Sequence, residues 1–236
     1  MSSSVLAVEC FDIQKKFGET LVLRGVNLTV PKGSFFMLVG PSGCGKTTLI
    51  SVIAGILKSD SGKCIVLGQS DQMMDPDHFL DFRAKNIGFI FQSYHLLNSL
   101  TVLDNVLIPL LINHLPYDQA VQKATHRLQQ VGLGARLDAF PSNLSGGEQQ
   151  RVAVARGFIH SPNILICDEP TSALDHQTGI QIIEMIKTLN EQSGMTVIIV
   201  THDSRILKYA DQIAYMEDGM IQKIVTQKNN RSGDNQ

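Results

Sequence analysis

Gly40-Pro41-Ser42-Gly43-Cys44-Gly45-Lys46-Thr47 is the stretch that decides the fold of this 236-residue chain. It matches the pattern G-x-x-x-x-G-K-[ST] at every position. It follows a nearly continuous apolar run, Ser34 to Val39, which is typical of a strand buried on both faces of a mainly parallel sheet. A helix is predicted directly after it, from about Lys46 to Leu57. The order of strand, glycine-rich loop and helix predicts an α/β fold whose loop binds phosphate.

The chemistry of this loop explains its residue types. Glycines let backbone N–H groups wrap closely around phosphate oxygens, and the helix that starts near Lys46 adds the positive end of its dipole. Lys46 is predicted to reach the β- and γ-phosphates, and the Thr47 hydroxyl to hold Mg²⁺. The alternative is a glycine-rich turn that only joins strand to helix, and the complete match disfavours it. The predicted ATP-binding residues here are Gly40, Pro41, Ser42, Gly43, Cys44, Gly45, Lys46, Thr47 and Thr48.

Two acidic residues follow a second apolar run. Ile164 to Cys167 is a predicted strand that delivers Asp168 and Glu169 at its carboxyl end, where ligands gather in parallel sheets. Asp168 is the predicted Mg²⁺ ligand, and Glu169 the predicted general base that polarises the attacking water. An Asp-Glu pair after a strand is by itself most often a solvated turn; the phosphate loop makes the catalytic interpretation the better one.

The remaining elements complete an α/β domain. Val5 to Phe11 and Leu21 to Val30 predict an N-terminal antiparallel β layer. Residues 100 to 140 show helical periodicity, with a helix start at Thr101-x-x-Asp104 and an amphipathic helix from Gln119 to Val131. Glu217-Asp218-Gly219 predicts a hairpin turn between two strands within Asp211 to Val225. Further predicted strands are Cys64 to Leu67, Ile87 to Phe91 and Met195 to Val200.

Composition excludes several other classes of protein. A hydrophobic fraction of 43% and a net charge of −2 are those of an ordinary globular protein and argue against a nucleic-acid partner. The four cysteines are widely separated and include no C-x-x-C pair, which fits a reducing cytoplasm. We find no secretory signal, and the densest apolar stretch, Val102 to Ile112, falls short of the roughly 20 residues of a spanning helix.

The segment Leu144-Ser145-Gly146-Gly147-Glu148-Gln149-Gln150-Arg151 makes a family resemblance specific. Ser145 and Glu148 have the spacing of a helix capping box, which would be an ordinary helix start. The adjacent glycines are not explained in that way, since they weaken a helix but open its N–H groups to an anion. The segment resembles the LSGGQ-type signature of ABC (ATP-binding cassette) ATPases. The resemblance implies that Ser145, Gly146, Gly147 and Glu148 contact the γ-phosphate of ATP held by an opposite subunit.

Other motifs of the family match in order between Val5 and Val225. The resemblance implies that Gln92 senses Mg²⁺ and the attacking water, that His202 contacts the γ-phosphate, and that Phe17 stacks on adenine. Ser172-Ala173-Leu174-Asp175 resembles the D-loop, which places Ser172 and Asp175 at a dimer interface. The other six histidines are expected to be solvated or structural. The expected domain spans residues 1–225, with a helical subdomain at about 93–160 and a polar tail at 226–236.

The resemblance also implies a mechanism and partners. Two cassettes, expected to be identical, would face each other head to tail around two ATP–Mg²⁺ and drive a separately encoded membrane permease, from the cytoplasmic face of the membrane. The stretches Ile87 to Leu97 and Leu100 to Leu111 resemble the LolD, MacB and FtsE group, which favours lipoprotein release or macrolide export. Alternatives are a polar amino-acid importer, a soluble ABC ATPase acting on nucleic acid or ribosomes, and a nucleotide-binding regulator without turnover, which Glu169 and His202 weigh against. The cargo and the transport direction are left open.

Overall fold

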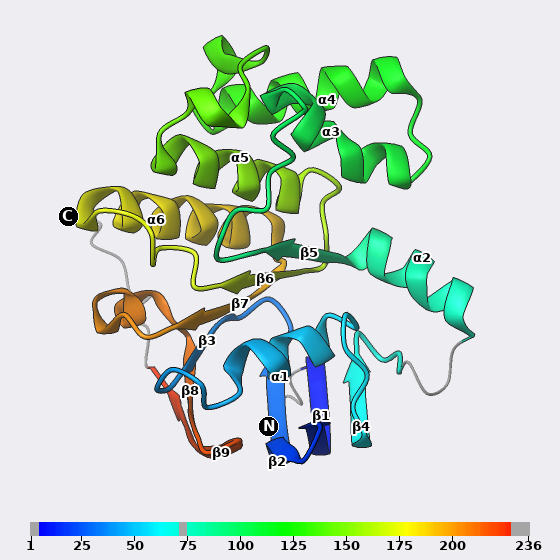
Figure 1. The fold of residues 1–236 in the computed structure, drawn as a ribbon, viewed down its shortest axis with the longest axis vertical. Coiled ribbons are helices and arrows are strands. Elements are labelled where there is room, and N and C mark those ends of the chain that lie inside the picture. The colour runs from blue at the N-terminus through cyan, green and yellow to red at the C-terminus, as the bar shows by residue number, and fades with distance from the viewer. Residues whose placement is uncertain (1–4, 71–74, 228–236) are drawn as a thin grey trace, which may run out of the picture.

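A mainly parallel six-stranded sheet forms the centre of the molecule, as the sequence predicts (Figure 1). The structure is a computed structural model that describes residues 5–70 and 75–227. The strand order is β5-β6-β7-β3-β8-β9, in which neighbours are parallel except for the antiparallel pair β8–β9. The strands are β3 (Phe35–Val39), β5 (Ile87–Ile90), β6 (Ile164–Asp168), β7 (Thr196–Thr201), β8 (Gln212–Glu217) and β9 (Met220–Thr226).

The central strands are apolar because both faces of the sheet are covered. Every residue of β6 and of β7 is buried. One face packs on α1 (Lys46–Ile53) and the other on α5 (Gly146–Phe158) and α6 (His176–Ser193), in two separate hydrophobic clusters. A parallel sheet whose faces are both covered needs continuous apolar runs rather than alternation.

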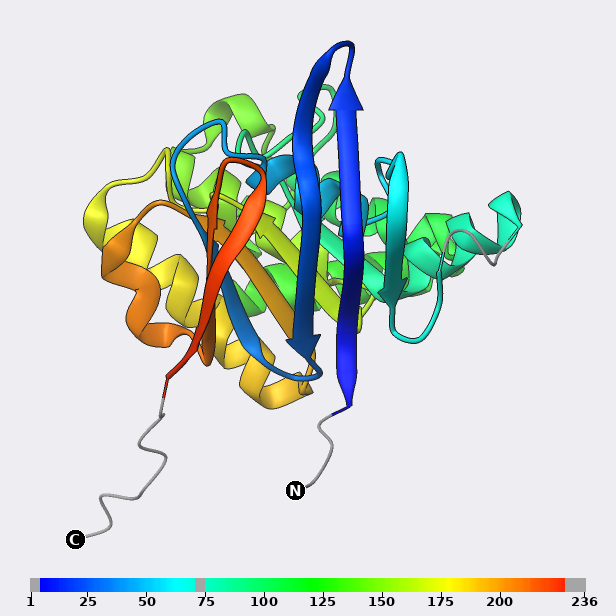
Figure 2. The ribbon, with the colours of Figure 1, turned by 90° about the horizontal axis from the view of Figure 1, so that it is seen from below.

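A second, antiparallel sheet lies on the far side of α1 (Figures 1 and 2). Its order is β2 (Thr20–Pro31), β1 (Leu6–Phe17) and β4 (Ser61–Val66). The predicted strand at Cys64 to Leu67 is therefore β4, which pairs with β1 and not with the parallel core. β4 is an edge strand of the antiparallel sheet and is only partly buried.

The first helix ends earlier than predicted. α1 stops at Ile53 instead of Leu57, and Gly55 follows with φ of 63°. A left-handed glycine just past the last turn is a common helix terminator. A side chain at this position would also meet the ring of Phe79, 2.4 Å from the new Cβ.

A layer of helices lies above α5 and α6 in Figure 1. α3 (Val102–Ile112) and α4 (Tyr117–Gln130) pack with α5 around a third hydrophobic cluster. The predicted start of α3 is confirmed, since Thr101 and Asp104 form a reciprocal capping box. α4 begins two residues before the predicted Gln119 and ends beside Gly132, whose φ is 75°. Short 3-10 turns follow at Gly134–Arg136 and Pro141–Asn143.

Two α-helices were not predicted from the sequence, α6 and α2. α2 (Pro76–Asn86) precedes β5, and its N-cap Asp75 accepts hydrogen bonds from the backbone N–H groups of Asp77 and His78, both at 3.1 Å. Aspartate followed by proline is a helix-start signal that could have revealed it. The helix is rich in charged residues and has no clear apolar stripe, which hid it from a periodicity argument.

The predicted C-terminal hairpin is confirmed. β8 and β9 are joined by Asp218 and Gly219, which have φ of 46° and 77°. A 3-10 segment, η3 (Ser204–Tyr209), connects β7 to β8. Of the predicted tail at 226–236, residues 228–236 lie outside the described part of the chain. Among the described residues, no helix combines the length and the apolar character that crossing a membrane requires.

Candidate active site

The phosphate loop joins β3 to α1 and leaves the N-terminus of that helix open. Gly45 occupies the N-cap position with φ of 102°, and no side chain caps the helix. The first N–H groups of α1 therefore lack a side-chain acceptor, which suits them to bind an anion. Gly43 also has a positive φ, 78°, so two of the loop glycines hold a conformation that other residues rarely adopt.

The C-terminal hairpin forms one wall of this loop. A Cβ on Gly40 would lie 2.1 Å from the carbonyl oxygen of Met216 in β8, so only glycine fits there. A Cβ on Gly45 would also crowd Met216, 3.1 Å from its Cε. The backbone N–H of Gly219 donates to the carbonyl of Cys44 at 3.1 Å. The loop shape thus depends on residues more than 170 positions later in the chain.

Lys46 places a positive charge on the loop. Its Nζ donates to the carbonyls of Gly40 and Pro41 at 2.8 and 2.7 Å, and lies 3.9 Å from Cys44 Sγ. The residue is buried, and its hydrogen-bond partners are neutral. A buried ammonium group without a paired carboxylate is well placed to attract phosphate oxygens.

Thr47 and Asp168 meet at the carboxyl end of β6. The Thr47 hydroxyl donates to the two carboxylate oxygens at 3.0 and 3.2 Å. Burial raises the pKa of Asp168; the nearby Glu169 also raises it, while the Thr47 hydrogen bond and Lys46 lower it. A buried carboxylate beside a hydroxyl offers the hard oxygen ligands that Mg²⁺ prefers, and a bound cation would relieve the cost of burying the charge. The residues present therefore fit the predicted metal.

Glu169 is held in an unusual backbone conformation between its predicted partners. Its φ is 46°, and its N–H donates to the carbonyl of Val200 in the neighbouring strand at 3.0 Å. One carboxylate oxygen lies 3.2 Å from His202 Nδ1 and the other accepts from Gln92 Nε2 at 3.4 Å. A left-handed glutamate costs about 1 kcal/mol or more, and such residues are concentrated at functional sites. The structure brings the three predicted catalytic side chains together.

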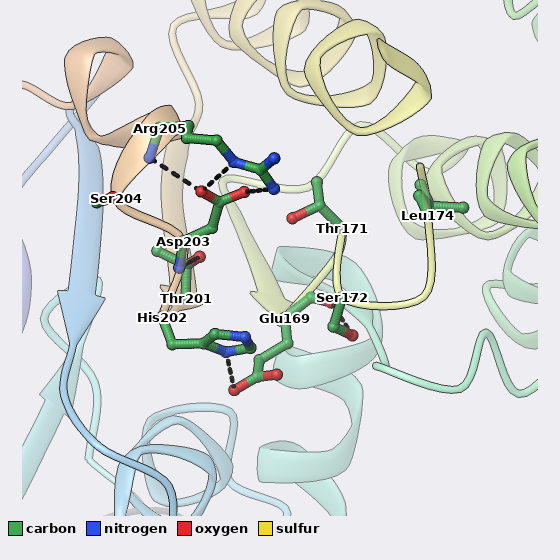
Figure 3. A pocket seen from close by; sticks show the side chains of 9 residues that line it. All are labelled: Glu169, Thr171, Ser172, Leu174, Thr201, His202, Asp203, Ser204 and Arg205. Atoms are coloured by element: carbon green, nitrogen blue, oxygen red, sulfur yellow. Dashed lines mark hydrogen bonds and ion pairs between the residues drawn. The ribbon is translucent and has the colours of Figure 1, made fainter. Parts of the chain in front are cut away.

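Two adjoining cavities share Glu169 as a lining residue. One, of about 300 Å³, is lined by the phosphate loop together with Val22, Gln92 and Glu169. The other, of about 310 Å³, lies between the segment after Glu169 and the segment after β7 (Figure 3). Figure 3 shows the side chain of His202 directed at Glu169, with Thr171 and Ser172 across the pocket from His202 and Asp203.

Comparison with known proteins decides the family. A model described as ABC transporter matches residues 23–172. The chain belongs to this family. This ABC ATPase is 41% identical over 220 residues to YbbA of Escherichia coli (strain K12), an uncharacterized ABC transporter ATP-binding protein; the match covers 92% of this chain and 96% of YbbA.

Two further relatives extend the comparison. The macrolide export ATP-binding/permease protein MacB of Shewanella sp. (strain W3-18-1) is 39% identical over 223 residues, which cover 94% of this chain and 34% of MacB. The ATP-binding cassette MJ0796, solved as a dimer in a post-hydrolysis state with ADP and Pi, is 34% identical, with a TM-score of 0.86 over 93% of this chain and 98% of that chain. The predicted fold class, the ATPase activity and the resemblance to the MacB group are thereby confirmed.

The signature segment of this ABC ATPase lies apart from its own phosphate loop. The Ser145–Glu148 capping box is present, with the Ser145 N–H donating to Glu148 Oε2 at 2.8 Å. A Cβ on Gly146 would lie 3.7 Å from Leu174, and one on Gly147 would lie 2.6 Å from Thr178. The signature glycines therefore contact the D-loop and the start of α6. Among the described residues, none of the signature segment lines the phosphate-loop cavity.

The D-loop residues have local structural roles in this protomer. Ser172 Oγ donates to the Glu169 carbonyl at 3.1 Å, and Asp175 caps α6 by accepting from the N–H of Thr178 at 3.0 Å. Phe17, at the end of β1, has a ring that is about half exposed and carries Lys15 Nζ 5.8 Å from its centroid. Its exposure leaves the ring face accessible, and adenine stacking by Phe17 stays a prediction.

Several residues around the site could not be found from the sequence. Arg205 forms a bidentate pair with Asp203 and donates to His176 Nδ1 at 2.9 Å. Arg156 donates to two carbonyls that follow Gln92. The contacts of Arg205 with His176 and of Arg156 with the segment after Gln92 join residues far apart in the sequence, and a single arginine or histidine carries no signal there. His176 was expected to be solvated or structural, and the structure shows it exposed and hydrogen-bonded to Arg205.

Proposed function

We propose that this ABC ATPase works as a head-to-tail dimer that closes around two ATP–Mg²⁺ and drives an integral membrane permease carried on a separate chain. The main support for the dimer is that the signature glycines lie away from the phosphate-loop cavity of the same protomer. The open N–H groups at Gly146 and Gly147 have no anion to bind unless a second subunit supplies one. The dimeric state described for MJ0796 supports this arrangement.

Within each site the residues have separate tasks. The phosphate loop and Lys46 bind the β- and γ-phosphates. Thr47, Asp168 and Gln92 hold Mg²⁺, which when bound neutralises charge on the phosphate oxygens. Glu169 accepts a hydrogen bond from the attacking water and takes its proton as the oxygen approaches the γ-phosphorus. His202 holds the Glu169 carboxylate from one side and reaches the γ-phosphate, so the base and the phosphate stay aligned.

Two cassettes joined in this way act as a switch. ATP binds across the interface, and the dimer is stabilised by contacts from both subunits to the same γ-phosphate. Cleavage of that phosphate removes the shared ligand and shifts the population toward the open form. Ser172 and Asp175 lie on the D-loop, next to the signature glycines, and are proposed to contact the partner.

An exposed apolar groove supports a membrane partner. It has a volume of about 320 Å³ and lies between α1, α2, α3 and β5. Ile56, Leu80 and Ile112 line it and are exposed at 42, 57 and 58%. Large apolar side chains gathered around a groove suit an apolar helix from another chain. Because MacB is named an ATP-binding/permease protein, we place a permease on this groove, which puts the cassette on the cytoplasmic face of the membrane.

We propose a permease of the lipoprotein-release or macrolide-export type. The MacB relative supports this choice over the alternative, an importer of the polar amino-acid type. A role on nucleic acid or ribosomes has little support, because the chain carries a net charge of −2. No nucleic-acid partner is therefore proposed.

The test is affinity isolation of tagged Glu169→Gln protein from detergent-solubilised native membranes with ATP–Mg²⁺. Recovery of a polytopic permease is expected, with the cargo indicated by its extracytoplasmic domain. The matched control adds Leu80→Asp, which places a charge in the groove and leaves the nucleotide site intact. The double variant should bind ATP normally and lose the permease. Recovery only from the soluble fraction, together with nucleic acid or ribosomes, would contradict the proposal.

A further inference from the structure

The two residues that follow Gln92 and Ser93 both have left-handed backbone conformations. Tyr94 has φ of 59° and His95 has φ of 47°. Neither is a glycine, and each such residue costs about 1–2 kcal/mol relative to an ordinary conformation. The segment is closed locally by two backbone hydrogen bonds, from Tyr94 N–H to Phe91 and from His95 N–H to Ser93. Two consecutive left-handed residues persist only where the surrounding structure holds them.

Arg156 of α5 holds both of these residues. Its Nη1 donates to the carbonyl of His95 and its Nη2 to the carbonyl of Tyr94, each at 2.6 Å. Burial lowers the pKa of the guanidinium group. Within the described chain Arg156 forms no ion pair with a carboxylate, so these two carbonyls are the partners of its planar fork. A lysine has no fork and cannot reproduce two parallel bonds.

Tyr94 also connects the segment to the signature. Its hydroxyl lies 3.1 Å from the position that a Cβ on Gly146 would occupy. Tyr94 therefore contacts both ends of α5. Its carbonyl accepts a hydrogen bond from Arg156, near the end of the helix, and its hydroxyl lies against Gly146, the first residue of the helix. Any side chain at position 146 would displace the Tyr94 hydroxyl. The contact joins the segment that follows Gln92 to the first of the two signature glycines.

The helix that carries both contacts is seated on the strand that precedes Gln92. A Cβ on Gly88 of β5 would lie 2.0 Å from the carbonyl oxygen of Gly157 in α5. Backbone therefore touches backbone at this point, and the helix cannot slide along the strand without a clash. β5, the segment after it and α5 are thus linked at three places: Gly88 with Gly157, Tyr94 and His95 with Arg156, and Tyr94 with Gly146.

We propose that Arg156 and Tyr94 are positioning residues that fix the signature glycines relative to Gln92. Gln92 belongs to the catalytic site of its own protomer, and Gly146 to the site completed by its partner. The clamp formed by Arg156 and Tyr94 holds Gln92 and the signature glycines of one protomer in one fixed relative position. Both sites of the dimer can then form together when it closes. The proposal rests on the ATP-bound dimer proposed above. In that dimer, two side chains outside the nucleotide-binding motifs would set the position of the signature glycines relative to Gln92.

The test uses Arg156→Lys and Tyr94→Phe in the Glu169→Gln background, where the dimer accumulates. Nucleotide affinity of the monomer is measured with a fluorescent ATP analogue, and dimer formation by light scattering after gel filtration over a series of ATP concentrations. Monomer affinity should stay within about twofold, because neither residue touches the phosphate loop. The ATP concentration at half-maximal dimerisation should rise about tenfold or more for Arg156→Lys and by a smaller factor for Tyr94→Phe.

Arg127→Lys is the matched control. Arg127 is also partly buried and also has a pKa lowered by burial, but its contacts are with Gln130 and the ring of Phe158 rather than with the carbonyls of Tyr94 and His95. It should dimerise like the parent. A second readout is the steady-state rate with Glu169 restored, where Arg156→Lys should lower kcat/KM by about tenfold or more.

A rescue experiment separates positioning from loss of folding. His95→Gly removes the left-handed cost at one of the two held residues and keeps its carbonyl. Added to Arg156→Lys, it should restore part of the dimerisation. The proposal is overturned if Arg156→Lys dimerises and turns over like the parent, or if its monomer loses ATP affinity in parallel with dimerisation. Failure of the Glu169→Gln parent itself to dimerise with ATP would overturn the proposed dimer, and the clamp with it.

Discussion

His202 Nδ1 lies 3.2 Å from Glu169 Oε1, and the two residues follow adjacent parallel strands, β7 and β6. The Glu169 side chain is mostly buried, whereas that of His202 is 60% exposed. The histidine therefore reaches the base from the open side, where a partner subunit and a γ-phosphate would lie. The buried Glu169 carboxylate is held in place as a proton acceptor, and the exposed His202 imidazole can contact a bound nucleotide.

Replacing Glu169 by glutamine should separate binding from hydrolysis. The amide keeps the size of the side chain but cannot take a proton, so turnover should fall by about 10²–10⁴-fold. ATP affinity should change little, and ATP should accumulate a dimer detectable by light scattering. Phosphate release measured in a single turnover checks the result. Normal turnover in this variant would remove Glu169 from the role of general base.

Lys46→Ala should lose nucleotide binding and turnover together. The substitution removes the only lysine that donates to the carbonyls of the phosphate loop in the described structure. The thermal shift given by ATP–Mg²⁺ should disappear, since a ligand stabilises a protein only as far as it binds the folded form. Lys32→Ala, at an exposed turn, should keep the full shift. An unchanged nucleotide affinity in Lys46→Ala would count against the loop assignment.

Asp168→Asn should stabilise the nucleotide-free protein while abolishing hydrolysis. Burial raises the pKa of Asp168, so the folded state binds its proton more tightly than the unfolded state does. Stability is then lost as pH rises through the unfolded pKa, near 4, toward the raised folded value. The variant lacks this loss, so its Tm at pH 8 should be higher than that of the parent. The gain should shrink as pH falls toward 4; an equal Tm at pH 8 would contradict the argument.

Gly40→Ala should damage both the fold and the site. Its Cβ would lie 2.1 Å from the Met216 carbonyl, so either β8 or the loop must move. We expect a loss of about 2–4 kcal/mol in unfolding free energy, together with loss of ATP binding. Gly68→Ala is the control: it has φ of 78° but no atom of the described residues within 4 Å of the new Cβ, and should cost about 1 kcal/mol with normal ATP binding. Equal effects at both positions would argue against the wall formed by Met216.

Local chemistry explains which parts of the structure were predictable. The capping boxes at Thr101 and Ser145 and the Asp218-Gly219 turn are set by residues within a few positions of one another, and all three are confirmed. The continuous apolar runs of β3 and β6 identified buried strands. The phosphate loop and Glu169 could be found because their motifs are contiguous.

Long-range contacts explain what was missed. β4 joined the antiparallel sheet because of its pairing with β1, 54 positions away at Cys10 and Cys64, which no local pattern encodes. Arg156 and Tyr94 are 62 positions apart. α2 lacked a clear apolar stripe and was recognisable only by its Asp75 cap. The motif residues could therefore be identified from the sequence. The strand pairings and side-chain contacts that position them could be seen only in the structure.

The wall that the β8–β9 hairpin adds to the phosphate loop has a consequence for synthesis on the ribosome. A nascent chain exposes the complete glycine-rich motif once residue 47 has left the exit tunnel, but Met216 and Gly219, which shape that motif, follow only after more than 165 further residues. Nucleotide cannot help an incomplete chain to fold through this loop. The ability to capture ATP should therefore arise only after the β8–β9 hairpin has been made and has packed against the phosphate loop.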